Sequence, residues 1–114
     1  FVIKNSTELA LNIVISNNIF KCAGFPAIGH HWDCGHHNIF IENNIFDGPS
    51  GLYGKSRGYI IFRPQVYDVE IKDNFFAMSE ETDSSDYAII YENPDKETLT
   101  TKGNVYVGRF DEVL

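Results

Sequence analysis

The chain has few basic residues, no long apolar run and little cysteine, and each shortage bears on function. Nine Lys and Arg stand against 16 Asp and Glu, which gives a formal net charge of -7 over 114 residues. Because nucleic acids and anionic membranes are bound through clustered Lys and Arg, we expect neither as a partner. No apolar run approaches the roughly 20 residues that a membrane-spanning helix needs. These shortages favour a ligand that is neutral or weakly charged.

Cysteine is limited to Cys22 and Cys34, which can form one disulfide or remain two buried thiols. Aromatic residues are plentiful, with nine Phe and six Tyr in a chain that is 43% hydrophobic. This content can fill a core, and the length predicts a single domain over residues 1–114. Since the chain begins at Phe1 with no signal-peptide pattern, we expect a mature product or a segment of a longer chain.

Four nine-residue stretches align without gaps. They are NIVISNNIF at 12–20, NIFIENNIF at 38–46, DVEIKDNFF at 68–76 and TLTTKGNVY at 98–106. Apolar and polar residues alternate within each, which predicts a half-buried strand. A second set of strand-like segments lies at 1–4, 26–32, 59–63 and 87–91. The sequence therefore predicts two strands per repeat and no helix.

Three positions of the repeat carry recurring residue types. Position six is Asn17, Asn43, Asp73 and Gly103; position seven is Asn18, Asn44, Asn74 and Asn104; position nine is Phe20, Phe46, Phe76 and Tyr106. Asn, Asp and Gly tolerate a left-handed backbone, so position six predicts a bend with positive φ. If successive repeats stack about 4.8 Å apart, position seven predicts an Asn ladder and position nine predicts an interior aromatic stack. An antiparallel meander is the alternative, but the connecting loops are long for hairpins.

This repeat, with its Asn ladder and Phe stack, resembles the right-handed parallel β-helix proteins of the pectate-lyase-like group from Phe1 to about Val107. The resemblance implies an all-β solenoid of about four coils. The closing TTKGNVYVGRFDEVL also resembles the late coils of bacterial glycoside hydrolases of that fold. It implies a secreted or cell-surface location and a polysaccharide or oligosaccharide as partner. Because no capping helix is evident, we expect a segment of a longer β-helix, with an oligomeric state that the sequence leaves open.

The segment GHHWDCGHH at 29–37 breaks the repeat and holds all four histidines. We interpret it as a sugar-binding or catalytic patch, with Asp33 and His31 as catalytic candidates and His30 and Trp32 as binding candidates. A zinc site formed by His31, Asp33 and either His36 or His37, with the Cys34 thiolate as a further option, is an alternative, although no known zinc signature matches. A solvated loop or a stacked imidazole that binds nothing is the simpler alternative.

A second departure from the repeat is DGPSGLYGKSRGY at 47–59, which we interpret as a glycine-rich binding loop. It supplies Asp47, which we pair with Asp33 as the two carboxylates of a glycoside hydrolase. The binding candidates from this loop and the strand after it are Tyr53, Lys55, Arg57 and Arg63. In a polysaccharide lyase, Lys55, Arg57 or Arg63 would instead neutralise a uronate carboxylate.

The acidic segment SEETDSSD at 79–86 offers oxygen ligands for calcium. It lacks the spacing of a known calcium loop, so we interpret it as a solvated loop and expect no cofactor. The resemblance thus implies a carbohydrate-active β-helix, with glycoside hydrolysis favoured. A polysaccharide lyase and a non-catalytic adhesive or structural β-helix are the alternatives.

Overall fold

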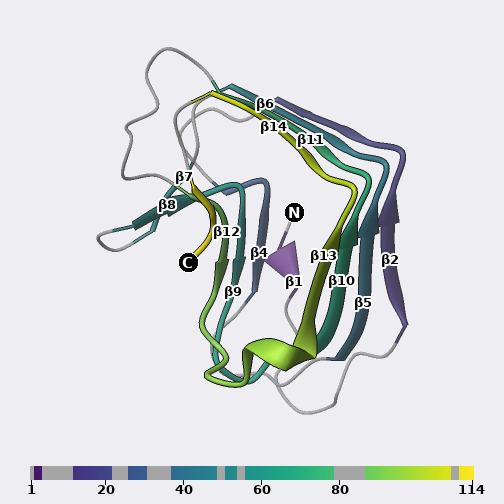
Figure 1. Ribbon diagram of the computed structural model, residues 1–114, viewed down its shortest axis with the longest axis vertical. Helices are drawn as coiled ribbons and strands as arrows, with labels where there is room; N and C mark the ends of the chain where they lie inside the picture. Colours follow the sequence, from purple (N-terminus) through teal and green to yellow (C-terminus); the bar gives the residue numbers. More distant parts are fainter. Residues whose placement is uncertain are drawn as a thin grey trace.

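A computed structural model describes residues 2–3, 12–21, 26–30, 37–48, 51–53, 56–78, 87–108 and 111–114. Within these ranges the protein is all-β, with three sheets of parallel strands and one antiparallel hairpin (Figure 1). Its only helix there is the short 3-10 helix η1 (Lys96–Thr98). The expected all-β class is confirmed.

The strands are distributed over the sheets as follows. Sheet 1 has the order β1 (Val2–Ile3), β4 (Ile28–His30), β9 (Ile60–Phe62), β12 (Tyr87–Tyr91) and β15 (Asp111–Val113). Sheet 2 has the order β2 (Ile13–Ser16), β5 (His37–Glu42), β10 (Tyr67–Lys72) and β13 (Leu99–Lys102). Sheet 3 has the order β3 (Ile19–Lys21), β6 (Ile45–Gly48), β11 (Phe75–Met78) and β14 (Val105–Val107).

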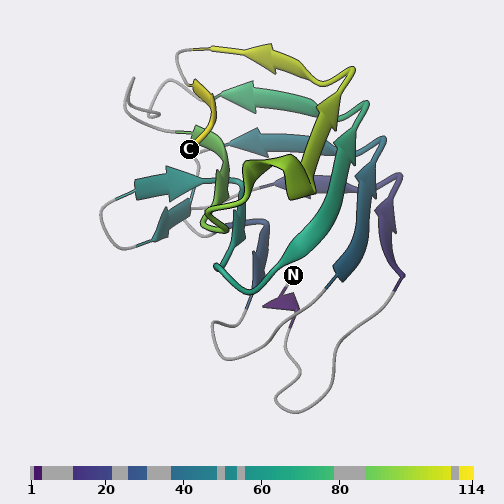
Figure 2. The same ribbon diagram turned by 60° about the horizontal axis from the view of Figure 1, so that its bottom comes forward.

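The chain visits sheets 1, 2 and 3 in turn, and each return adds a strand beside the preceding one. Figure 2 shows the resulting layers of sheets 2 and 3, which meet at a sharp bend. All strand pairs in the three sheets are parallel, and equivalent repeat positions face each other, as Ile13 faces Ile39 in β2 and β5. The repeat seen in the sequence is therefore a repeat in space.

Each repeat contains three sheet strands, so the prediction of two strands per repeat is wrong. Every nine-residue stretch is divided at position six, where Asn17, Asn43, Asp73 and Gly103 have φ of 59°, 56°, 56° and 69°. The predicted positive-φ bend is confirmed. A left-handed residue departs from the extended backbone of a strand, and at position six it turns the chain from sheet 2 into sheet 3.

A second bend with positive φ occurs at position one, in Asn12, Asn38 and Asp68. The pairing of β10 with β5 passes from Tyr67–His37 directly to Val69–Ile39 and skips Asp68 and Asn38. The two residues thus form matching irregularities in neighbouring strands, as in a β-bulge. The sequence pattern did not reveal this bend, because the fourth copy has Thr98 in η1 there.

The Asn ladder is confirmed at position seven. The side-chain Nδ2 of Asn18 donates to Asn44 Oδ1, Asn44 to Asn74 and Asn74 to Asn104, each over 3.1 Å. The backbone N–H groups of the same residues donate to the same oxygens over 2.9 to 3.0 Å. Asn44 and Asn74 are buried to 1% exposure, so the ladder satisfies polar groups that have no access to water.

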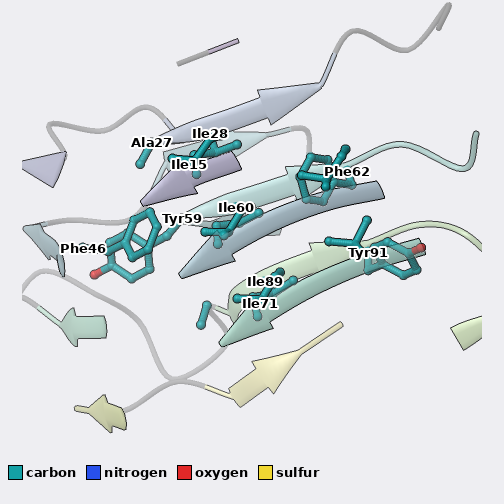
Figure 3. Packing of buried hydrophobic residues seen from close by; sticks show 14 of the residues in the cluster. Ile15, Ala27, Ile28, Phe46, Tyr59, Ile60, Phe62, Ile71, Ile89 and Tyr91 are labelled. Atoms are coloured by element: carbon teal, nitrogen blue, oxygen red, sulfur yellow. The ribbon is translucent and has the colours of Figure 1, made fainter. Parts of the chain in front are cut away.

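The aromatic stack is also confirmed. Ring centroids of Phe20, Phe46, Phe76 and Tyr106 follow one another at 5.1, 4.8 and 5.2 Å, with interplanar angles of 11°, 7° and 5°. Inward side chains from all three sheets complete the core, as Ile28, Ile71 and Phe46 illustrate (Figure 3). With the interior packed in this way, the described strands offer their outer faces for binding.

Candidate functional site

Sheet 1 has an outer face whose residues alternate with those of the core. Ile28, Ile60 and Ile89 pack inward, whereas the residues that follow them, Gly29, Ile61 and Ile90, are absent from the core cluster. Alternation along a strand places these three on the opposite side of the sheet. Gly29, Ile61 and Ile90 therefore form one row across β4, β9 and β12.

The glycine-rich segment, expected to be a loop, contains a hairpin of β7 (Gly51–Tyr53) and β8 (Ser56–Gly58) beside sheet 1 (Figure 1). A β-carbon on Gly58 would lie 3.1 Å from Ile90 Cγ1, so the hairpin backbone rests directly on β12. Ile61 and Ile90 are only 2% and 4% exposed despite their outward position. The outer face is thus covered over β9 and β12.

The same row is open at β4. A β-carbon built on Gly29 meets no atom within 4 Å, and Gly29 has no positive φ that would require glycine. Glycine inside a strand weakens the strand, and it often marks a place where another group approaches the backbone closely. The accessible backbone at Gly29 is therefore a candidate contact surface for a ligand.

An ion pair lies beyond the covered row on the same face. Arg63 follows Ile61 by two residues, and its Nη1 donates to both oxygens of Glu92 over 3.1 and 3.3 Å. The two side chains are 22% and 32% exposed. The pair therefore presents hydrogen-bonding groups at a partly shielded position beside β9 and β12.

Arg63 is one of the binding candidates predicted from the sequence, whereas its partner Glu92 is not. YIIFR at 59–63 and AIIYE at 88–92 align without gaps, which pairs Arg63 with Glu92. The backbone N–H of Glu92 donates to Phe62 O over 2.9 Å and fixes this register. Applying the repeat comparison to the second set of strands would have found the pair.

Asp47 is exposed in β6 on sheet 3, between Lys21 and Ala77 in register. Arg63 belongs to sheet 1, so the two described candidates lie on different sheets. The chain connects them through the hairpin, where Tyr53 is in β7 and Arg57 in β8. His30 ends β4 on sheet 1. Residues 48–59 thus carry the chain from the sheet of Asp47 to the sheet of Arg63.

The remaining candidates lie outside the described residues. They are His31, Trp32, Asp33 and Lys55, together with Cys22, Cys34, His36 and the acidic segment 79–86. The pairing of Asp33 with Asp47, the calcium alternative and the disulfide stay predictions.

His37, an alternative zinc ligand, lies in β5 with its ring stacked on Tyr67 at 4.8 Å and 21°. Over the described ranges no three His, Cys, Asp or Glu side chains are grouped as a metal site would require. The described part of the chain also has no helix long and apolar enough to cross a membrane. The described contact of His37 is thus with an aromatic ring.

Two tyrosines at the edges of the core have altered ionisation. Burial raises the pKa of Tyr91, whose hydroxyl donates to Val66 O and is 2.7 Å from Thr98 Oγ1. Burial also raises the pKa of Tyr106, and its hydrogen bond to Glu112 adds to this shift. Both phenols remain protonated near neutral pH and join neighbouring segments, which is a structural role.

Comparison with protein-family models, with curated proteins and with solved structures finds no match to this chain. The candidate site on the outer face of sheet 1 therefore rests on geometry alone, namely the uncovered position at Gly29 and the Arg63–Glu92 pair.

Proposed function

We propose that the three sheets are those of a right-handed parallel β-helix of the pectate-lyase-like type, and that the chain is a segment of a longer one. Three features support this: the cyclic order of the sheets, the Asn ladder at one corner and the aromatic stack inside. In such a fold, neighbouring turns present outward side chains about 5 Å apart. A binding site is then built across turns.

We further propose that the protein is carbohydrate-active, secreted or displayed at the cell surface, and acts as a glycoside hydrolase on a polysaccharide or oligosaccharide. The supporting observation is the outer face of sheet 1, which is open at Gly29 and carries the Arg63–Glu92 pair on the same side. Partly exposed backbone at a strand glycine leaves room for a ligand to approach closely, and a guanidinium beside a carboxylate donates to and accepts from hydroxyl groups. These are the contacts that a sugar needs.

Hydrolysis requires two carboxyl groups on either side of the glycosidic bond. In this proposal one of Asp33 and Asp47 protonates the leaving oxygen, and the other attacks the sugar or activates water. His31 assists proton transfer. The residues assigned to sugar binding are His30, Trp32, Tyr53, Lys55, Arg57 and Arg63.

A non-catalytic adhesive β-helix is the second candidate, and one observation favours it. Sheet 3 exposes a row of apolar side chains in register, namely Ile19, Ile45, Phe75 and Val105, with exposed fractions of 66%, 41%, 38% and 50%. Contiguous exposed apolar side chains often mark interaction surfaces. An adhesin would use this row and would need no catalytic carboxylate.

A glycan-array screen of the wild type and Gly29→Leu tests the binding site. A β-carbon at this position meets no atom within 4 Å, so we expect the fold to survive and glycan binding to fall at least tenfold. Thr100→Leu, which enlarges an exposed residue of β13, is the matched control and should bind as the wild type does. If Gly29→Leu binds glycans as tightly as Thr100→Leu does, the face at Gly29 is not the glycan-binding site.

Product analysis of any bound glycan tests the reaction. We expect new reducing ends without unsaturation, and loss of turnover with retained binding in Asp33→Asn and Asp47→Asn. Unsaturated uronate products would indicate a lyase. Binding through Ile45 or Phe75 without any turnover would indicate an adhesin.

A further inference from the structure

The Arg63–Glu92 pair also bears on the charge of the sugar, an inference that rests on the proposed function. Arg63 Nη1 contacts both Glu92 oxygens within 3.3 Å, and the backbone bond from Glu92 to Phe62 holds the strands together at this point. The positive charge of Arg63 is thus already balanced by a carboxylate on the neighbouring strand.

A uronate carboxylate approaching Arg63 would also approach Glu92. The side chains are only 22% and 32% exposed, so solvent screens this repulsion less than it would at a fully exposed pair. The net charge of -7 adds an unfavourable field for any anionic polymer. Arg63 is therefore poorly suited to neutralise a sugar carboxylate.

A neutral sugar carries no carboxylate, so neither Glu92 nor the net negative charge of the protein repels it. Its hydroxyl groups both donate and accept, so they can hydrogen-bond to the guanidinium and to the carboxylate without separating the two. The ion pair then contributes to recognition as an intact unit.

We propose that the outer face of sheet 1 selects neutral sugars over uronic acids, and that Glu92 is the residue that determines this specificity. A neutral substrate has no carboxylate to acidify the neighbouring C–H proton. The inference therefore favours hydrolysis over elimination at this site.

The test compares a neutral hexose oligomer with its C6-carboxylate counterpart of the same linkage, by calorimetry at low salt. The wild type should bind the neutral oligomer more tightly. Glu92→Gln should raise affinity for the carboxylate form about fivefold, the scale of one partly exposed ion pair, and this gain should shrink as salt is added. Affinity for the neutral oligomer should change less than twofold, because glutamine keeps the hydrogen-bonding shape.

Glu70→Gln is the matched control. Glu70 also pairs with a cation, Lys72 Nζ at 3.3 Å, but on sheet 2. It should leave both affinities unchanged, and circular dichroism should show that both variants fold.

Tighter wild-type binding of the carboxylate form would overturn the inference and leave the proposed function standing. An unchanged preference in Glu92→Gln, or an equal gain in Glu70→Gln, would also overturn it. If a folded wild type binds neither oligomer nor any arrayed glycan, the proposed function fails and the inference fails with it.

Discussion

Asn at position seven satisfies several buried groups at once. In Asn74, Nδ2 donates to Ile41 O over 2.9 Å and to Asn104, while Oδ1 accepts from the backbone and side chain of Asn44. A side chain with one donor arm and one acceptor arm is required, and a carboxylate lacks the donor. This requirement explains why the same residue recurs four times.

Replacing Asn74 by alanine should therefore be costly. The change removes the side-chain donor to Ile41 O and the oxygen that accepts from the Asn44 backbone N–H and from one Nδ2 hydrogen of Asn44, in a site of 1% exposure. We expect the free energy of unfolding to fall by about 2 to 4 kcal/mol, measured by urea denaturation. Asn18→Ala removes an exposed end of the same ladder and should cost about 1 kcal/mol or less. Equal losses would contradict a ladder whose strength depends on burial.

The sequence predicted positions six, seven and nine because one chemical requirement limits the residue types at each: tolerance of a left-handed backbone, a side-chain amide and an aromatic ring, respectively. Position one also carries Asn12, Asn38 and Asp68 with positive φ, but Thr98 in the fourth copy hid the pattern. Glu92 was missed for another reason, since an ion pair between turns has no linear motif. It becomes evident only when the register of the second set of strands is known.

The hairpin β7–β8 depends on a close approach between elements. A β-carbon at Gly58 would lie 3.1 and 3.2 Å from the Cγ1 and Cδ1 atoms of Ile90. Sequence reasoning described this segment as a loop, because two three-residue strands packed on another sheet leave too short a pattern to recognise. The sequence shows Gly58, but it does not show that this glycine packs against Ile90.

Gly58→Ala should lift the hairpin from sheet 1. We expect a loss of about 1 to 2 kcal/mol in the free energy of unfolding, because neither backbone nor core can move freely. Ile90→Val removes the Cδ1 atom and should recover part of the loss in the double variant. Gly29→Ala is the control, because it adds a methyl group where there is space. We expect its free energy of unfolding to rise by about 0.5 to 1 kcal/mol. An equal loss at both glycines would exclude the contact as the cause.

Alkaline pH should loosen the segments that Tyr91 and Tyr106 join. Both pKa values are raised above the ordinary value of 10.0, chiefly by burial. The unfolded chain therefore releases these protons at lower pH than the folded chain does. The stabilisation that the two protonated phenols give the folded state is fully present below about pH 10 and is lost as the pH rises above this value.

Urea midpoints between pH 8 and 11 measure this dependence, and ultraviolet titration of the phenols locates the ionisation. Tyr106→Phe should reduce the fall in stability, since phenylalanine keeps the stack on Phe76 but has no proton to lose. An unchanged fall in that variant would show that other groups control the alkaline transition.

At the scale of the molecule, the described strands form parallel sheets whose inner strands have neighbours on both sides. β5 and β10 lie inside sheet 2, and β6 and β11 lie inside sheet 3, whereas β2, β3, β13 and β14 lie at sheet edges. Stability in stacked repeats is a sum of terms within each turn and between neighbouring turns. The central turns should therefore be the most stable part of the described structure.

Hydrogen exchange measures this gradient. Within sheet 2, the amides of β5 and β10 should exchange most slowly and those of β2 and β13 fastest. At a sheet edge, some backbone N–H groups have no neighbouring strand to accept their hydrogen bonds. The order should not change with protein concentration if the edges are open. Equal protection of β2, β5, β10 and β13 would mean that further strands cover the edges. A rise in edge protection with concentration would assign those strands to a second copy, whereas protection independent of concentration would assign them to the same chain.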